Sequence, residues 1–298
     1  MTVADHSKRA RKILVIFNPA AGWRRRRKLD RFVDALRAHS CMVDVLETTA
    51  PGDATRFAAN SVGSDYDVIA VAGGDGTINE VVNGLNGSTL PIAVAPLGTA
   101  NVLAAEIGLP RSLAACADVV CSGRPRPVHL GAFDGRLFII MAGIGFDARV
   151  VADVSPALKR RLRKAAYVLK TLIGAFRYPP TVYDVEVDGV SYRATSAIIA
   201  KGRHYGGDYI CAPDARLDDP AFQVCLFHSA GWWHVLRYGL GLIRGRLAFY
   251  PDVEIVRGRQ VTIADGAGDP VQADGDLIGR LPGTVEIAAK TVSLICPA

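Results

Sequence analysis

The segment Gly73–Asn79, GGDGTIN, combines a glycine-rich turn with a single carboxylate, Asp75. Glycines let backbone N–H groups approach an anion closely, and the N–H groups at the start of a following helix point at the same place. The segment therefore predicts phosphate binding. A carboxylate there would repel phosphate, so Asp75 needs another role. It could bind a cation, which would turn the repulsion into attraction, or it could accept hydrogen bonds within the turn. The sequence alone leaves both roles open.

Two other glycine-bearing loops, Asn18–Gly22 (NPAAG) and Pro96–Asn101 (PLGTAN), also follow short apolar runs typical of buried strands. Ligands of open α/β sheets bind at the carboxyl ends of the strands, so the three loops predict one shared site. A purely structural interpretation of the middle loop is a tight turn. In that case Thr77 caps a helix that starts near Ile78, and Glu80 completes a capping box.

Strands and helices alternate over residues 1–130, which predicts a parallel sheet with helices on both faces. The expected strands are Ile13–Phe17, Met42–Thr48, Val68–Ala72 and Ile92–Ala95. Four apolar residues between the first two strands have the i, i+3, i+4, i+7 spacing of one helix face: Leu29, Phe32, Val33 and Leu36.

The better-known nucleotide motifs are missing from the sequence. Gly74 and Gly76 begin a G-x-G-x-x-G pattern, but Asn79 stands where the third glycine is required. There is also no G-K-[ST] P-loop and no H-R-D segment of protein kinases.

The pattern changes after residues 123–128. Alternating apolar residues over 183–187 precede Asp188 and Gly189, which predicts a β-hairpin. One helix is expected at residues 157–178, where an apolar stripe bordered by Lys and Arg fits either domain packing or docking onto a membrane surface. The rest predicts a mostly antiparallel β domain with strands at Ser196–Lys201, Gln223–Phe227, Asp252–Val256, Gln260–Ala264, Val271–Ala273, Thr284–Ala288 and Val292–Cys296.

The composition is that of a globular protein with anionic partners. The 298 residues suggest about two domains at roughly 150 residues each, and half of the residues are hydrophobic. The net charge of +6 favours nucleotides, acidic membrane surfaces or nucleic acid without choosing among them. No aromatic–basic motif supports nucleic acid, so we expect none as a partner.

The sequence gives no signal for export or membrane insertion. Its first residues are polar and charged, unlike an export signal. The most hydrophobic later stretch, residues 226–243, contains His228, His234 and Arg237 and falls short of about 20 apolar residues. The six cysteines form no C-x-x-C pair or zinc-like group, which predicts reduced thiols in a cytoplasmic protein.

Taken in order, NPAAG, GGDGTINEVVNGL and PLGTANVLA resemble the diacylglycerol kinase catalytic family, which includes sphingosine, ceramide and bacterial soluble lipid kinases. The resemblance continues through APDARLDD (residues 212–219) and ADGD (residues 273–276), so it covers nearly the whole chain. The glycine–aspartate–glycine motif alone is shared with NAD kinases and phosphofructokinases, and the surrounding motifs narrow the match.

This resemblance implies an α/β nucleotide-binding domain at residues 1–130, an antiparallel β-sandwich that binds the lipid at 131–284, and a C-terminal segment, 285–298, returning towards the first domain. ATP would lie between the domains, with Mg²⁺ held by Asp75 directly or through water. The residues matched to nucleotide binding are Thr48, Gly73, Gly74, Asp75, Gly76, Thr77, Ile78, Asn79 and Thr99.

The resemblance also implies a catalytic role for Asp274, as the general base that takes the proton from the lipid hydroxyl. Its structural alternative is an ordinary β-turn at Asp274 and Gly275. Asp276, the second residue matched to catalysis, stands where the family usually has glutamate, and Val102 stands where many members have aspartate. These departures keep open a nucleotide- or lipid-binding regulator that has lost catalysis, and an NAD-kinase-like enzyme is a second alternative.

Further expectations concern a metal and the protein's partners. The resemblance implies a structural Mg²⁺ held by the carbonyls of Arg216 and Ala221 and the carboxylate of Asp219, where the alternative is a solvated acidic turn. The basic run Arg24–Lys28 fits a solvated helix face, or contact with ATP phosphates or anionic lipid. We expect a lipid substrate, transient contact with an anionic membrane surface, and a homodimer. The sequence does not identify the acceptor lipid.

Overall fold

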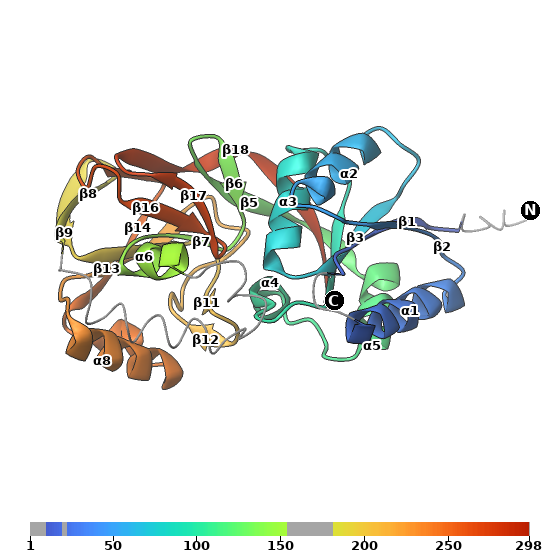
Figure 1. The fold of residues 1–298 in the computed structure, drawn as a ribbon, viewed down its shortest axis with the longest axis horizontal. Coiled ribbons are helices and arrows are strands. Elements are labelled where there is room, and N and C mark those ends of the chain that lie inside the picture. Colours follow the sequence, from blue (N-terminus) through green and yellow to red (C-terminus); the bar gives the residue numbers. More distant parts are fainter. Residues whose placement is uncertain (1–9, 20–22, 154–180, 298) are drawn as a thin grey trace, which may run out of the picture.

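The computed structural model describes residues 10–19, 23–153 and 181–297, in two parts that lie side by side (Figure 1). The first part is an α/β unit whose elements are β1 (Lys12–Phe17), α1 (Trp23–Ala38), β2 (Met42–Glu47), α2 (Asp53–Ser61), β3 (Val68–Gly73), α3 (Asp75–Leu85), β4 (Ile92–Pro96), α4 (Val102–Glu106) and α5 (Leu113–Ser122). The four strands are parallel, as the sequence predicts, and lie in the order β2-β1-β3-β4.

Helices cover both faces of this parallel sheet. On one face, α1 and α5 pack against β1 and β3 through residues such as Phe32, Leu36 and Val120. On the other, α2 and α3 pack through residues such as Ala58, Val81 and Leu85. Because β1, β3 and β4 are buried on both faces, these three strands are continuous apolar runs, whereas the edge strand β2 is mostly exposed.

The second part is a β-sandwich. One of its sheets is antiparallel and has the order β14-β13-β10-β7-β16-β17. The opposing layer includes β15, β8 and β9, and aromatic residues such as Phe133, Tyr183 and Phe222 fill the core between the layers. The elements of this part, with those that lead into it, are β5 (Arg124–Phe133), β6 (Arg136–Phe138), β7 (Met141–Gly145), α6 (Phe146–Asp153), β8 (Tyr183–Val187), β9 (Val190–Ala194), β10 (Ser196–Ala200), β11 (His204–Tyr205), β12 (Tyr209–Ile210), β13 (Phe222–Phe227), α8 (Trp232–Ile243), η1 (Leu247–Phe249), β14 (Val253–Gly258), β15 (Gln260–Ile263), β16 (Pro270–Ala273), β17 (Asp276–Arg280) and β18 (Gly283–Cys296).

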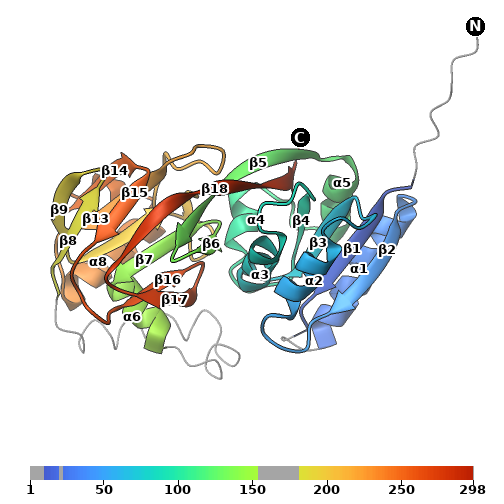
Figure 2. The ribbon, with the colours of Figure 1, turned by 90° about the horizontal axis from the view of Figure 1, so that it is seen from above.

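The last strand, β18, joins the two parts (Figure 2). It pairs with β15 in the second part, runs antiparallel along β5, and reaches β4 of the first part through Leu294 opposite Ile92. The C-terminal segment therefore returns to the α/β unit, as the fold-class prediction states. The domain limits predicted near residues 130 and 285 fall inside β5 and β18, and they stay a prediction.

Three local predictions differ from the structure. Helix α3 begins at Asp75 rather than near Ile78, and Gly74 is its N-cap. Glu80 does not form a capping box with Thr77, because its carboxylate accepts hydrogen bonds from the backbone N–H groups of Gly52 and Ala54 at the start of α2. The strands expected at 284–288 and 292–296 are one strand, β18, with a register shift between them.

Two helices of the second part were not expected from the sequence. Helix α6 is only 8 residues long, and α8 lies in the hydrophobic stretch at 226–243. None of the helices in the described ranges has the length and apolarity needed to cross a bilayer. The helix predicted at 157–178 lies outside the described residues.

Helix α3 carries the GGDGTIN segment, and its position depends on a close contact with α2 at Gly84. A Cβ at Gly84 would lie 2.3 Å from the carbonyl oxygen of Thr55. Although alanine normally stabilises a helix interior by about 1 kcal/mol over glycine, Gly84→Ala should destabilise the protein. Gly239→Ala in α8 is the matched control, because nothing lies within 4 Å of that position and it should be neutral or stabilising. Thermal unfolding of both variants checks this, and a stabilised Gly84→Ala would contradict the α2–α3 contact.

Candidate active site

Two of the glycine-bearing loops, and Asn18 at the start of the first one, meet at the carboxyl ends of β1, β3 and β4, while residues 20–22 of the first loop lie outside the described residues. The side-chain amide of Asn18 donates to Thr77 Oγ1 at 3.0 Å, and Leu97 N donates to the carbonyl of Gly73 at 3.0 Å. A Cβ on Gly98 would stand 2.5 Å from Gly74 Cα, so the second and third loops touch through glycine backbone. The structure thus brings the second and third loops, and Asn18 of the first, together at one sheet edge.

The turn at Gly73–Asn79 has the shape of an anion site. The N–H groups of Thr77 and Ile78 close the first helical turn onto the carbonyl of Gly74. Because the first residues of an α-helix carry N–H groups without intrahelical partners, the start of α3 can receive an anionic group. A Cβ on Gly73 would stand 2.8 Å from the Thr77 side chain, which explains why glycine is needed there.

Asp75 connects this turn to the neighbouring loop. Its Oδ1 accepts a hydrogen bond from Leu103 N at 3.2 Å, at the start of α4. Burial raises the pKa of the Asp75 carboxyl, while the backbone N–H groups of Leu103 and Val102 oppose that shift. Asp75 therefore has a hydrogen-bond role between loops, rather than only within its own turn. Its predicted role as a metal ligand stays a prediction.

Asp274 joins the two parts of the molecule. It lies with Gly275 at the tip of the β16–β17 hairpin, and both residues have the positive φ angles, 49° and 85°, of a tight hairpin turn. Its Oδ2 accepts from Asn79 Nδ2 at 2.8 Å and from Ile139 N at 2.9 Å. Its Oδ1 accepts from the N–H groups of Ile140 and Met141, both at 3.0 Å.

These four hydrogen bonds occupy the acceptor positions of the Asp274 carboxylate. A carboxylate offers about four lone-pair directions, two on each oxygen. Burial raises the pKa of the Asp274 carboxyl, and the surrounding N–H donors oppose the shift because they favour the ionised form. In this geometry Asp274 anchors the hairpin on Asn79 and on the segment before β7. A proton from a substrate would have to displace one of these donors.

Asp276 lies on the same hairpin but in a different environment. It is exposed, and its Oδ2 lies 3.1 Å from the position that a Cβ on Gly76 would take. The carboxylate therefore faces the glycine turn where phosphate is expected. Of the two predicted catalytic carboxylates, Asp276 is the one open to solvent.

The remaining predicted nucleotide residues lie around the same edge. Thr48 is buried directly after β2, and its N–H donates to the carbonyl of Phe17 at 2.9 Å. Thr99 is exposed in the third loop. Val102, which stands where many members of that family have aspartate, begins α4 and is buried in the core cluster, so this position contributes packing rather than charge.

Lys201, which sequence reasoning missed, extends its side chain to the predicted metal loop. The carbonyl oxygens of Arg216, Asp219 and Ala221 all accept hydrogen bonds from Lys201 Nζ. Lys201 is fully buried, and burial lowers the pKa of its ammonium to about 8. The signal available in the sequence was a lysine closing the apolar strand SAIIA, where a buried charge needs a partner. Within the described part of the chain, no three His, Cys, Asp or Glu side chains gather as a metal group.

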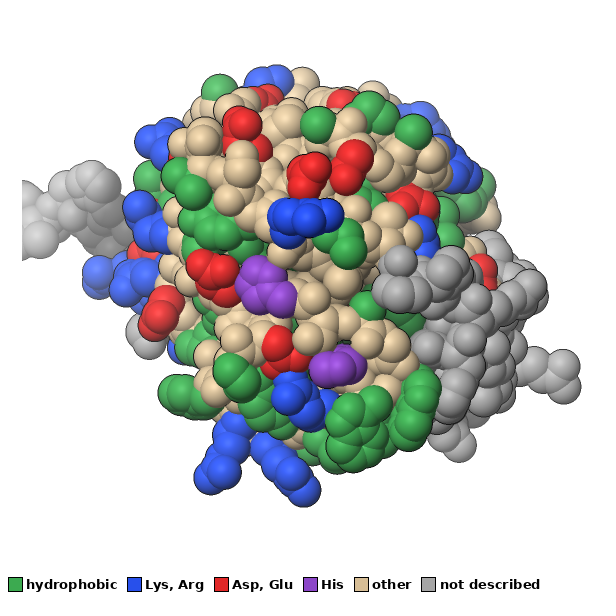
Figure 3. Space-filling view, turned by 90° about the vertical axis from the view of Figure 1, so that its left-hand side faces the viewer, with side chains coloured by type: hydrophobic (Ala, Val, Ile, Leu, Met, Phe, Trp, Pro, Cys, Tyr) green, Lys and Arg blue, Asp and Glu red, His purple; other side chains and the backbone are tan. Residues whose placement is uncertain are grey.

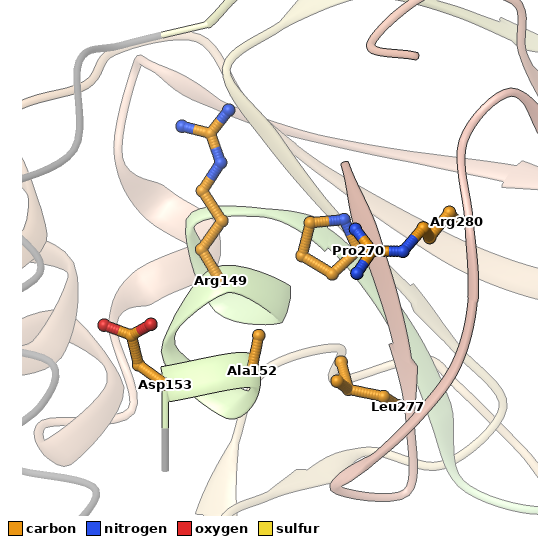
Figure 4. A pocket seen from close by; sticks show the side chains of 6 residues that line it. All are labelled: Arg149, Ala152, Asp153, Pro270, Leu277 and Arg280. Atoms are coloured by element: carbon orange, nitrogen blue, oxygen red, sulfur yellow. The ribbon is translucent and has the colours of Figure 1, made fainter. Parts of the chain in front are cut away.

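Two surface features lie outside this cluster of loops. In α1, Arg26 forms an ion pair with Glu47, so part of the predicted basic run is engaged with β2. A pocket of about 240 Å³ lies between α6 and the β16–β17 hairpin, and Arg149 at its edge pairs with Asp269 at 3.0 Å. No residue matched to nucleotide, base or metal lines this pocket, whose lining residues are Arg149, Ala152, Asp153, Pro270, Leu277 and Arg280 (Figure 4).

Comparisons with known proteins agree with this arrangement. Residues 12–133 match the family described as "Diacylglycerol kinase catalytic domain", and residues 140–296 match the "YegS C-terminal NAD kinase beta sandwich-like domain". A protein named diacylglycerol kinase from Bacillus subtilis (strain 168) is 31% identical over 298 residues, covering 97% of each chain. One from Staphylococcus carnosus is 29% identical, covering 92% of this chain and 90% of its own.

The fold is also found in solved structures. A crystal structure described as a diacylglycerol kinase from Bacillus anthracis superposes with a TM-score of 0.76 at 24% identity, covering 97% of this chain and 98% of its own. A second structure from the same organism gives a TM-score of 0.80 at 22% identity, covering 100% and 99%. These structures share the α/β unit and the β-sandwich.

The contact between Asn79 and Asp274 yields a pH-dependent prediction. Asn79→Asp would place two carboxyl groups within hydrogen-bond distance, and such a pair holds a proton that each alone would release. The pair's pKa is then raised in the folded state, so its contribution to stability is present at low pH and lost as the pH rises. We expect the destabilisation by Asn79→Asp to be larger at pH 8 than at pH 5, and the difference reaches about 1.4 kcal/mol when the pair's pKa in the folded state lies about one unit above pH 5.

The matched control is Asn79→Ala, which removes the donor without adding charge. It should cost about 1–3 kcal/mol, the usual cost of a lost partner for a buried polar group, with little difference between the two pH values. Urea unfolding at both pH values measures these losses. If Asn79→Asp showed the same pH dependence as Asn79→Ala, the two side chains would not be in contact.

Proposed function

Because the chain belongs to the diacylglycerol kinase catalytic family and is a lipid kinase, we propose that it transfers the γ-phosphoryl group of ATP, with Mg²⁺, to the hydroxyl group of a diacylglycerol- or sphingosine-like lipid. The observation that carries the proposal is the meeting of the GGDGTIN turn with the ADGD hairpin. Asn79 bonds Asp274, and Asp276 faces Gly76. Phosphoryl transfer needs this kind of juxtaposition, because positioning and charge neutralisation supply most of its catalysis.

Binding of ATP is the first step assigned to these residues. The glycine turn and the start of α3 would hold the phosphates through backbone N–H groups, with Thr48 and Thr99 as further contacts. Asp75 fits a role towards Mg²⁺, since it is a partly buried carboxylate at the edge of that turn and hard cations prefer oxygen donors. The metal would neutralise charge on the phosphates.

Deprotonation of the lipid hydroxyl is the second step, and the two carboxylates of the hairpin, Asp274 and Asp276, are the candidates for the base. The family resemblance implies Asp274. Its four hydrogen bonds support a different assignment, in which Asp274 fixes the hairpin and the exposed Asp276 accepts the proton. The aspartate in place of glutamate is then compensated by the close approach of Asp276 to Gly76, where no side chain intervenes.

Access to a lipid requires contact with a membrane, and α8 offers a suitable surface. Its outward residues, Trp232, Trp233, Leu236, Leu240 and Ile243, are all at least 40% exposed although they are apolar. Their spacing places them along one side of the helix. Phe249 in η1 is 80% exposed. We call these six residues the α8 surface. Figure 3 shows hydrophobic and basic side chains gathered on the lower part of this face of the molecule, where α8 lies.

The rest of α8 is fixed to the protein, so its outer face is presented rigidly. Tyr238 packs against Phe227 with ring centroids 5.0 Å apart, and its hydroxyl donates to Asp252 at 2.6 Å. Exposed Arg244 and Arg246 follow the helix. Aromatic residues beside arginines suit the interface of an anionic bilayer, where the rings enter the headgroup region and the guanidinium groups pair with phosphate.

The base assignment is tested by Asp276→Asn and Asp274→Asn. Asp276→Asn should lower turnover by about 10²–10⁴-fold, the usual contribution of general-base catalysis, while ATP affinity and thermal stability change little. Asp274→Asn should lower stability by about 1–3 kcal/mol, because its amide NH₂ would face N–H donors. The assays are steady-state phosphorylation of diacylglycerol, sphingosine, ceramide and phosphatidylglycerol, calorimetric binding of ATP, and thermal unfolding.

Other outcomes point to other assignments. A stable Asp274→Asn variant without turnover, beside an active Asp276→Asn variant, would restore Asp274 as the base. Wild-type turnover in both variants would remove both carboxylates from the mechanism. A wild-type protein that binds ATP and phosphorylates none of the four lipids would favour the regulator, and phosphorylation of NAD would favour the NAD-kinase-like alternative.

The membrane surface is tested by the double variant Trp232→Ser and Trp233→Ser. Removing two half-exposed indole rings should weaken binding to vesicles containing anionic phospholipid by about tenfold or more, since burying one large apolar side chain contributes about 1.5–3 kcal/mol. Val190→Ser is the control, because Val190 is equally exposed at 55% but lies in the β8–β9 hairpin. Vesicle co-sedimentation measures binding. If the double variant changed the oligomeric state and left vesicle binding intact, the α8 surface would instead be an interface of the predicted homodimer.

A further inference from the structure

The loop between β12 and β13, where the resemblance implies a structural Mg²⁺, is organised around a side chain of the protein itself. Lys201 Nζ lies 3.1 Å from the carbonyl oxygen of Arg216 and 3.1 Å from that of Ala221, and it also donates to the carbonyl of Asp219. Two of these three oxygens are the carbonyls that were assigned to the metal. The oxygens therefore converge on an ammonium group.

The three N–H groups of the Lys201 ammonium match the three carbonyl oxygens in number. An ammonium group has three N–H donors and no acceptor, and three carbonyl oxygens receive them here. Lys201 is fully buried, so its charge would be strongly unfavourable without such partners. Since a hard cation and an ammonium both prefer oxygen ligands, one set of carbonyls can serve either, but a divalent ion placed among them would meet the positive charge of Lys201 at close range.

The carboxylate assigned to the metal is engaged elsewhere. Asp219 Oδ1 accepts from Arg257 Nη2 at 2.8 Å, and its Oδ2 lies 3.3 Å from Arg257 Nε, which is a two-point pairing. The neighbouring Asp218 pairs with Arg216. The predicted ligand set is thus divided, because its carbonyls face Lys201 and its carboxylate faces Arg257. It does not fit a divalent metal in this chain.

We propose that Lys201 is a built-in cation that replaces the structural Mg²⁺ of this loop, so that the loop keeps its shape without a divalent metal. The proposal concerns folding of the loop and does not depend on the proposed phosphoryl transfer. A nucleotide-bound Mg²⁺ at Asp75 is a separate ion.

The test uses the protein without nucleotide, so that Mg²⁺ bound with ATP does not contribute. The melting temperature of the wild type should be the same in EDTA and in excess Mg²⁺. Lys201→Met keeps most of the side-chain volume but removes the charge. It should melt at a lower temperature in EDTA and recover part of the loss when Mg²⁺ is added, because the three carbonyls then lack a cation.

A wild type whose melting temperature falls in EDTA and rises with Mg²⁺ would overturn the proposal, and so would a Lys201→Met variant that Mg²⁺ does not stabilise. If Lys201→Met fails to fold, titration with Mn²⁺ decides the question through the number of bound ions measured by electron paramagnetic resonance. Asp219→Ala should bind as many Mn²⁺ ions as the wild type. The loss of one ion in Asp219→Ala would place a metal at the loop and refute the replacement.

Discussion

The arrangement of the whole site depends on one buried carboxylate. Asp274 accepts hydrogen bonds from Asn79 in the α/β unit and from the three consecutive backbone N–H groups of residues 139–141, at the start of β7. The desolvation cost of such a group is large, and four donors offset it. Any other placement of the hairpin would leave this charge with fewer partners. The distance between the glycine turn and Asp276 is therefore set by electrostatics rather than by apolar packing, which tolerates small shifts.

Lys201 is held in a similar way, on the other side of the backbone segment that binds Asp274. Ile140 N donates to Asp274, while the carbonyl of Ile140 accepts from Lys201 N at 2.8 Å. One peptide segment thus lies between a buried anion and the residue that carries a buried cation. Both charges are held mainly by main-chain groups, whose positions follow from the sheet, so neither depends on a flexible partner. This explains how a β-sandwich can hold the β16–β17 hairpin rigidly at its edge.

The sequence was most informative where local spacing and local structure coincide. The parallel strands β1, β3 and β4 are continuous apolar runs, and the glycine loops follow them directly, so both could be predicted. The start of α3 could not be predicted, because Thr77 and Glu80 have the spacing of a capping box while Glu80 in fact bonds the start of α2, 26 residues earlier. The partner of the Arg216 and Ala221 carbonyls was equally hidden. Lys201 precedes them by 15 and 20 residues, and backbone carbonyls carry no signature in a sequence.

The course of β18 has a consequence for biosynthesis. The sheet edge at β4 is built from the first hundred residues, yet the strand that pairs with it, β18, comes from residues 283–296. During translation β4 is an open strand edge until β18 is made, and such an edge can pair with another exposed strand. The long sequence separation between these partners also makes their pairing a late and slow event. We therefore expect that shielding of this edge in the nascent chain, until residues 283–296 emerge, limits wrong strand pairing.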